Sequence, residues 1–294
     1  MVFSKILCPT DFSAGSQQAL RVAVRMANEA NAEIVVFHAF YIPPPAFDGE
    51  YVFPVDVIQQ MVDDSQRGLD AAVRDATAAG AKHARGTLVS GAPWAEIVAV
   101  LERETFDLCV IGTHGRTGIA RVLLGSVAEK VVRHSPCSVL VVRPGSETRP
   151  FAHVLVPTDF SESAEDALGL AAQVVRPDGS ITLLHVLEAP AAYSGEPLGI
   201  DFLRELDKQS TAALEAAATR VRSKVAVPVR VRSRIGHPGA QILADLDDDP
   251  SVDLVVMGSH GRTGITRVVI GSVAEKVVRH APCPVAVARK RASR

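Results

Sequence analysis

The sequence predicts an α/β fold in two tandem copies, each an open parallel sheet of five strands covered by helices. Residues 112–142 and 258–288 are identical at 23 of 31 positions, at an offset of 258 − 112 = 146. The segment LCPTDFS at 7–13 returns as LVPTDFS at 155–161, at an offset of 155 − 7 = 148. Such a repeat indicates one domain present twice. We place the copies at residues 1–145 and 152–294, joined by a linker with Pro, Gly and Ser.

The order of elements within one copy is the third observation, because continuous apolar strands alternate with amphipathic helices. Strands are expected at 5–8, 33–38, up to Gly91, 106–111 and 139–142, and helices at 17–30, 55–79, 93–104 and 127–134. Ser13 or Ser16 caps the first helix, and Pro93 occupies a favourable first-turn position. This alternation is typical of a parallel, doubly wound sheet. The second copy repeats this order of elements. The two copies are least similar where residues 40–57 of the first correspond to residues 187–203 of the second.

Composition restricts the class of protein. Hydrophobic residues make up 47% of the chain, but no apolar run reaches the roughly 18 residues of a membrane span. The net charge is 31 − 33 = −2 without a basic stripe, which disfavours nucleic-acid binding. The N-terminus has no signal-peptide pattern, so we expect a soluble cytoplasmic protein. The cysteines have no metal-ligand spacing and are expected to be small core residues: Cys8, Cys109, Cys137 and Cys283.

A glycine loop between the fourth strand and the following helix is the main candidate for chemistry. The pattern G-x-x-G-x9-G-S occurs at Gly112, Gly115, Gly125 and Ser126, and again at Gly258, Gly261, Gly271 and Ser272. Glycines let the backbone approach a ligand closely, and the serine is expected to cap the helix. A helix N-terminus after such turns suits a phosphate or another anion. The alternative is an ordinary tight turn with a helix cap.

A second motif, Thr-Asp-Phe-Ser, follows the first strand at the same carboxyl edge of the expected sheet. Asp11 and Asp159 can accept a hydrogen bond from a base or a ribose there, or they act only as helix caps. Common nucleotide and hydrolase motifs are absent from the sequence: the Gly-Lys pair of a P-loop, GxGxxG, GxSxG and HExxH.

Together, PTDFS, the GxP turns at 91–93 and 236–238, and the glycine pattern followed by VAEKVVRHSPCSVLVV resemble the universal stress protein family in its tandem form. The resemblance covers essentially the whole chain and implies an adenine-nucleotide-binding, Rossmann-like fold. The family divides into members with the glycine motif, which bind ATP, and members without it. The resemblance therefore implies ATP binding in both copies, with Mg²⁺ held by the phosphates.

The resemblance also implies the residues of each nucleotide site. In the first copy the adenosine end is lined by Pro9, Thr10, Asp11 and Ala39, and ribose and phosphates contact Gly112, Gly115, Gly125, Ser126 and Val127. The matching residues of the second copy are Pro157, Thr158, Asp159, Val186, Gly258, Gly261, Gly271, Ser272 and Val273. Ala39 is smaller than the branched apolar residue usual at its position, which predicts looser adenine packing in the first copy.

Histidines and arginines near the motifs leave alternatives open. His114 and His260 either contact phosphate or face solvent. The arginines either neutralise phosphate charge or are solvated: Arg116, Arg121, Arg262 and Arg267. Two histidines at strand ends are expected to bond the backbone, and two in last helical turns to complement the helix dipole: His38 and His185, and His134 and His280.

No general base, carboxylate pair or metal cluster accompanies the loop, so we expect no enzyme and at most slow ATP hydrolysis. The expected function is a nucleotide-dependent sensor or regulator in the stress response. The alternatives are a slow ATPase or nucleotide-transferring enzyme of the same fold, and an interaction module whose glycine loops are structural. The last strands are short and apolar, and strand edges of this kind invite pairing. The resemblance implies that the two copies pack through them as an intramolecular pseudo-dimer, with a homodimer as a further form. No nucleic acid or membrane partner is expected.

Overall fold

The computed structural model describes residues 3–42, 54–113, 124–146, 149–188, 200–261 and 270–290, with 200–207 described by their backbone alone. The chain divides into two compact units. Unit 1 lies within residues 1–149, and unit 2 lies within residues 150–290. Most of the stretch in which the two copies differ most, at 43–53 and 189–199, lies outside the described residues.

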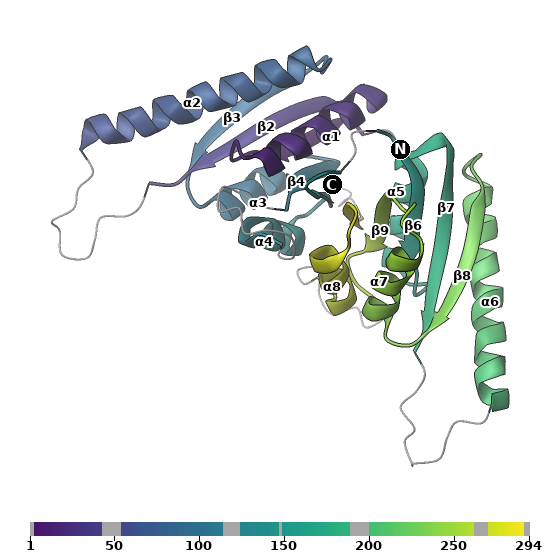
Figure 1. Ribbon diagram of the computed structural model, residues 1–294. Coiled ribbons are helices and arrows are strands. Elements are labelled where there is room, and N and C mark those ends of the chain that lie inside the picture. The colour runs from purple at the N-terminus through teal and green to yellow at the C-terminus, as the bar shows by residue number, and fades with distance from the viewer. Residues whose placement is uncertain are drawn as a thin grey trace, which may run out of the picture. The chain divides into compact units, whose positions relative to one another are not determined.

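Unit 1 has a parallel sheet with the strand order β3-β2-β1-β4-β5, which confirms the expected fold class. Its elements are β1 (Lys5–Pro9), α1 (Ala14–Ala30), β2 (Glu33–Phe40), α2 (Val55–Ala78), β3 (Ala84–Ser90), α3 (Pro93–Arg103), β4 (Leu108–Gly112), α4 (Ser126–His134) and β5 (Ser138–Val142). Helices α1 and α2 contact each other, as do α3 and α4 (Figure 1). The winding reverses between β1 and β4, so the carboxyl ends of these two strands form the switch point where such sheets bind ligands.

Unit 2 repeats this arrangement with the strand order β10-β9-β6-β7-β8. Its elements are β6 (Phe151–Pro157), α5 (Glu162–Val174), β7 (Val175–Leu187), α6 (Ile200–Arg222), β8 (Val229–Ile235), α7 (Pro238–Asp248), β9 (Leu254–Gly258), α8 (Ser272–His280) and β10 (Val285–Ala288). Helix α5 has 13 residues where α1 has 17, and strand β7 begins directly at its end. The switch point of this unit lies between β6 and β9.

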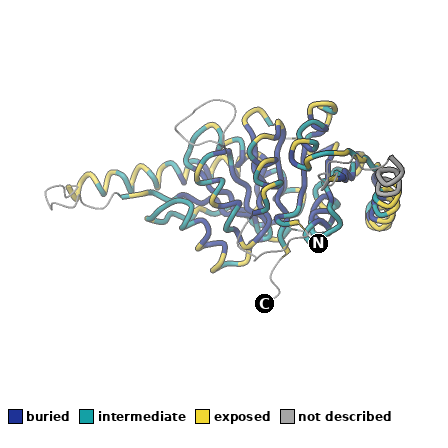
Figure 2. The backbone as a smooth tube through the Cα atoms, turned by 90° about the horizontal axis from the view of Figure 1, so that it is seen from below, coloured by how far each residue is buried: buried dark blue, intermediate teal, exposed yellow. Residues whose placement is uncertain are grey.

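The strands form the core of each unit. Ile6 and Leu7 of β1 and Leu155 and Val156 of β6 are fully buried, and Figure 2 shows the inner strands largely dark blue, whereas the edge strands β3 and β8 are only partly buried. Each such aliphatic side chain contributes about 1.5–3 kcal/mol by leaving water. The four cysteines are buried with free thiols, as expected of core residues. Burial raises the pKa of the Cys8 thiol to about 12, which keeps it protonated and unreactive.

Helix caps resolve one expectation and correct another. The side chain of Ser13 caps α1 by accepting from the N–H of Ser16, so Ser13 and not Ser16 is the cap. For α4 the expected serine cap was wrong, because Gly125 is the N-cap and Ser126 is the first helical residue. The reason is local: Gly125 has the extended backbone of a cap, and its carbonyl accepts the first intrahelical bond from Glu129 at 2.9 Å. Helix α8 has the same cap at Gly271.

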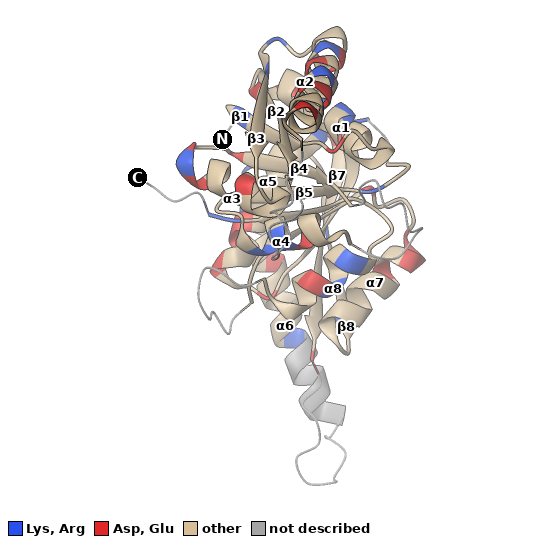
Figure 3. Cartoon of the chain, turned by 90° about the vertical axis from the view of Figure 1, so that its left-hand side faces the viewer, with Lys and Arg blue, Asp and Glu red and all other residues tan. Residues whose placement is uncertain are grey.

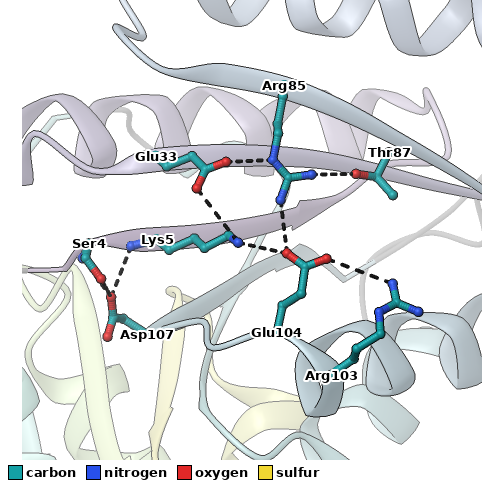
Figure 4. Close-up of polar contacts among 8 residues, drawn as sticks. All are labelled: Ser4, Lys5, Glu33, Arg85, Thr87, Arg103, Glu104 and Asp107. Atoms are coloured by element: carbon teal, nitrogen blue, oxygen red, sulfur yellow. Dashed lines mark hydrogen bonds and ion pairs between the residues drawn. The ribbon is translucent and has the colours of Figure 1, made fainter.

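A charged network fixes the amino edge of the sheet in unit 1, opposite the switch point (Figure 4). The Nζ of Lys5 lies 2.8 Å from the Oε2 of Glu104, and the guanidinium of Arg85 lies 2.6 Å from Glu33 and 3.0 Å from Glu104. Asp107 accepts from the backbone N–H of Lys5 at 3.0 Å. These residues come from β1, β2, β3, the C-cap of α3 and the position just before β4, so the network ties the starts of four strands together.

Unit 2 uses a different charged cluster, placed between β8 and α7. Asp245 is fully buried, and its two carboxylate oxygens lie 2.6 Å from Arg232 and 2.7 Å from Arg234. The same guanidiniums also contact Asp249 and Asp248. Because a buried carboxylate needs paired and hydrogen-bonded partners, this double arginine contact is what allows Asp245 to lie in the core.

The described helices show no membrane-spanning candidate, since none combines sufficient length with sufficient hydropathy. The longest of them, α2, has acidic and basic residues along its length, coloured red and blue in Figure 3. Its buried contacts are Leu69, Ala72 and Ala76, which lie toward its C-terminal half.

Candidate functional site

The Thr-Asp-Phe-Ser segment forms a tight turn directly after the first strand of each unit. In unit 1, the Oγ1 of Thr10 accepts from the N–H of Phe12 at 3.0 Å, and the Oδ1 of Asp11 accepts from the N–H of Ser13 at 3.1 Å. Unit 2 repeats both bonds at 3.1 and 3.0 Å. Short polar side chains that bond the backbone two residues on are a standard way to build such turns. The cap of α1 is Ser13, so the interpretation of Asp11 as the helix cap was wrong.

The phenylalanine of the turn has a left-handed backbone in both units. Phe12 has φ 66° and Phe160 has φ 65°, a region that a bulky residue enters at a cost of about 1–3 kcal/mol. Only three non-glycine residues of the described chain have a positive φ, and two of them occupy this one position. The strain coincides with the switch point of each sheet, which is where functional strain is expected.

A buried histidine on the second strand lies against this turn. The Nδ1 of His38 lies 2.7 Å from the carbonyl oxygen of Thr10, and His185 makes the same contact with Thr158 at 2.8 Å. These contacts confirm that both histidines bond the backbone at strand ends. The imidazole of His38 also packs on the ring of Phe12 with 4.3 Å between centroids, and the second pair is separated by 4.6 Å.

The glycine loop is closed at its base by backbone hydrogen bonds. The N–H of Gly125 donates to the carbonyl of Thr113 at 2.7 Å, and the N–H of Gly271 donates to Ser259 at 2.8 Å. Thr113 and Ser259 are buried. Each loop therefore leaves the sheet and returns to it at one point, beside the N-terminus of α4 or α8.

The aspartate and the glycine loop meet in unit 2. A Cβ atom placed on Gly261 would lie 3.0 Å from the Oδ2 of Asp159. The two residues are 261 − 159 = 102 positions apart in the sequence, and the switch point brings them into contact. Gly115, the matching glycine of unit 1, lies outside the described residues.

Gly112 and Gly258 have a packing reason for lacking a side chain. A Cβ on Gly112 would lie 2.8 Å from the carbonyl oxygen of Gly15, and one on Gly258 would lie 2.7 Å from that of Ser163. Both contacts are with the backbone in the first turn of α1 or α5, which cannot easily move. These two glycines therefore let the strand end pack closely against the helix, whatever else their backbone contacts.

Ser163 anchors the glycine loop of the second copy. Its Oγ accepts from the N–H of His260 at 3.3 Å. The His260 ring also bonds the hydroxyl of Ser259 at 2.8 Å, and the residue is half-buried. The matching residue of the first copy is Gly15, at the offset of 148, which has no hydroxyl. This difference between the two copies is visible in the sequence, but its effect follows only from the contact between Ser163 and the loop.

The helix after the loop presents its N-terminus at the same edge. Its N-cap is a glycine, which offers no side-chain oxygen to the first-turn amides, and Ser126 and Ser272 are exposed in that turn. First-turn amides and the positive end of the helix dipole attract an anion by about 0.3–2 kcal/mol. Glu129 and Glu275 oppose this in part, and each is paired with an arginine one turn later.

The remaining candidates lie around this edge or outside the described part of the chain. Pro9 and Pro157 end the first strands, Ala39 and Val186 follow the buried histidines on β2 and β7, and Val127 and Val273 are in the first turn of α4 and α8. The described residues do not include His114, Arg116, Arg121, Arg262 and Arg267. His134 and His280 are in the last turns of α4 and α8, as expected. Among the described residues no group of three His, Cys, Asp or Glu is placed to hold a metal ion.

Comparisons with known proteins agree with this fold. The sequence profile of the universal stress protein family matches residues 3–143 and 150–289. A universal stress protein of Methanocaldococcus jannaschii is 34% identical over 146 residues, which are 48% of this chain and 83% of that protein. One from Mycobacterium tuberculosis is 32% identical over 187 residues, covering 63% of this chain and 62% of that protein.

A crystal structure agrees along the whole chain. The universal stress protein from Archaeoglobus fulgidus DSM 4304 aligns with a TM-score of 0.73 at 26% identity, covering 98% of both chains. Because the family profile matches both copies and together these matches span almost the entire sequence, the chain belongs to the universal stress protein family, with two family domains in tandem.

Proposed function

We propose that each copy binds one adenine nucleotide, ATP with Mg²⁺ on its phosphates, and that the chain is a nucleotide-dependent regulator of the stress response. The observation that supports this most strongly is the contact between Asp159 and Gly261 at the switch point of unit 2. The Thr-Asp-Phe-Ser turn and the glycine loop are remote in sequence but meet there at one edge of the sheet. Asp159 offers a hydrogen-bond acceptor, and Gly261 lets a ligand approach the backbone closely.

The charges at this edge suggest how the nucleotide would lie. A carboxylate repels phosphate and accepts hydrogen bonds from hydroxyl and amino groups, so Asp159 suits the ribose or the base. Phosphates would lie further along the loop, against the first-turn amides of α8 and the exposed hydroxyl of Ser272. Mg²⁺ prefers oxygen ligands and keeps several waters, so phosphate oxygens with water are a sufficient donor set for it.

Little or no hydrolysis is part of this proposal. Phosphoryl transfer depends on a cation clamp and a group that orients the attacking water. The sequence lacks the Gly-Lys pair of a P-loop, and the described carboxylate at the loop, Asp159, suits the adenosine end. Phosphate release at saturating ATP should therefore be far below the roughly 1–100 s⁻¹ typical of kinases. Turnover of several per second that disappears in Asp11→Ala and Asp159→Ala would instead identify an ATPase.

Mass spectrometry of the purified and then denatured chain tests whether nucleotide is a natural ligand. Released ATP or ADP supports the proposal. Sites without nucleotide, in a protein that also binds none on addition, would favour an interaction module with structural glycine loops. Turnover of ATP together with an acceptor substrate would favour a nucleotide-transferring enzyme of this fold.

A further inference from the structure

We propose that His38 and His185 are positioning residues of the two nucleotide sites: each holds the left-handed turn that carries Asp11 or Asp159 at the switch point of its unit. This inference rests on the proposed function, since the site it serves is the nucleotide site. It assigns a role to a pair of buried polar residues that the sheet itself does not require.

The chemistry of the contact defines the state of the imidazole. Nδ1 of His38 lies 2.7 Å from the carbonyl oxygen of Thr10, and a carbonyl can only accept, so Nδ1 carries a proton and donates. His185 has the same tautomer for the same reason, at 2.8 Å from Thr158. Both histidines are 7% exposed, so this bond is shielded from competing water.

The imidazole acts on both neighbours of the aspartate. Its Nδ1–H holds the carbonyl of the preceding threonine, and its ring supports the following phenylalanine at 4.3 Å in unit 1 and 4.6 Å in unit 2. The interplanar angles are 39° and 35°, so the two rings have nearly the same arrangement in both copies. Phe12 and Phe160 have φ 66° and 65°. A phenylalanine persists there only when its surroundings hold it.

Ordinary core packing does not account for the histidine. The residues next to it in the strands, Phe37 and Val36 in β2 and Leu184 and Leu183 in β7, are apolar and buried. An apolar side chain at this position would fill the space without burying a polar ring. What an apolar residue lacks is the donor for the threonine carbonyl, and that donor is directed at the turn.

The test uses substitutions at His38 in the full chain, with the second copy as an internal reference. His38→Leu removes the donor, and His38→Phe removes it while keeping a flat ring against Phe12. His38→Asn keeps a donor, because its amide nitrogen is as far from the backbone as Nδ1. Calorimetric titration with ATP and Mg²⁺ measures both sites. The fluorescence of Trp94, the only tryptophan and a residue of unit 1, verifies that this unit is folded.

The expected result is an affinity at the first site about tenfold weaker in His38→Leu and His38→Phe, equivalent to about 1.4 kcal/mol. The second site should keep its affinity, and His38→Asn should recover most of the loss at the first. If the histidine had only a structural role, His38→Asn would restore nucleotide affinity no further than it restores folding. Unchanged affinity in a folded His38→Phe protein would overturn the inference. A wild-type chain that binds no nucleotide would overturn the proposed function, and the positioning role with it.

A crystallographic comparison tests the conformational step without nucleotide. In His38→Phe, residue 12 should leave the left-handed region while residue 160 of the same chain stays in it. If φ at residue 12 remains near its wild-type value without the donor, the histidine does not hold the turn and the inference is wrong.

Discussion

Asp11 and Asp159 take their position from the residues on either side of them. The threonine before the aspartate and the aspartate itself bond the backbone two residues on, and these short bonds fold the turn. The turn then places the carboxylate of Asp159 against Gly261. A few local hydrogen bonds thus place an acceptor at the switch point, where the sheet leaves room for a ligand.

Gly261→Ala should weaken nucleotide binding at the second site and leave the first unchanged. The added methyl group would lie 3.0 Å from the Oδ2 of Asp159, closer than ordinary contacts allow, so carboxylate or loop must shift. The matched control is Gly169→Ala on α5, where the new methyl group meets nothing within 4 Å. A calorimetric titration of both variants measures the effect, and equal affinities for the two would contradict this account of the glycine.

Sequence reasoning identified the candidate site residues but only part of the local structure around them. It identified the aspartates and the loop glycines from their repetition. It misplaced the helix cap at Ser126, because a glycine with an extended backbone is hard to distinguish by sequence from the serine after it. It did not find the left-handed Phe12, since that conformation depends partly on His38, 26 residues away (38 − 12 = 26).

At the scale of elements, the two copies stabilise equivalent strands and helices with different charges. Unit 1 ties the starts of β1, β2 and β3 to the end of α3 through Lys5, Glu33, Arg85 and Glu104. Unit 2 joins β8 to α7 through Asp245, at a position where unit 1 has the buried Val100. The alternation of strands and helices predicted both sheets, but not these networks, because their partners are brought together only by the fold.

The stability contributed by Glu104 should depend on pH. The hydrogen bond from Lys5 is the main cause that lowers the pKa of this carboxyl below its ordinary value of 4.5. The folded state therefore favours the ionised form, so the contribution is present above that ordinary value and is lost as pH falls through the folded-state pKa. Urea unfolding of Glu104→Gln should show a lower free energy of unfolding than wild type at pH 7, with the difference vanishing in acid. Glu102→Gln, exposed in the last turn of α3, is the control, and a difference that persists in strong acid would refute the assignment.

Asp245→Val should strongly destabilise unit 2, by about 3–5 kcal/mol, because it leaves two guanidiniums at a partly buried position without their shared carboxylate. The first copy shows which residues can replace all three members of this cluster. Its residues at the same three positions are Thr87, Val89 and Val100, so Arg232→Thr, Arg234→Val and Asp245→Val together should recover most of the lost stability. Urea unfolding followed by circular dichroism measures both variants. A neutral single variant would show that the cluster does not stabilise the fold.

At the scale of the whole molecule, the chain is one family domain present twice, and its two candidate sites are built alike but not identically. The turn, the histidine and the helix cap recur in both units. Ser163 anchors the loop of the second copy, where the first has Gly15, and Ala39 replaces the branched Val186. These differences lead us to expect the weaker site in the first copy.

Separation of the chain at its linker tests whether the copies pair. The last strands, β5 and β10, are short and apolar and end the strand order of their units. Strands of this kind pair readily with another strand when their backbone groups have no partner. Residues 1–145 and 152–294, produced separately and mixed, should therefore associate one to one in analytical ultracentrifugation. Halves that both stay monomeric at tens of micromolar would contradict the expected pseudo-dimer.

The central claim, one adenine nucleotide site in each copy, is tested most directly by calorimetric titration of the nucleotide-free wild-type chain with ATP in the presence of Mg²⁺. The account predicts two molecules of ATP per chain, with the weaker site abolished by Asp11→Ala and the tighter one by Asp159→Ala. Binding of a single ATP would mean that one copy has lost its site. No binding of any adenine nucleotide would contradict the account.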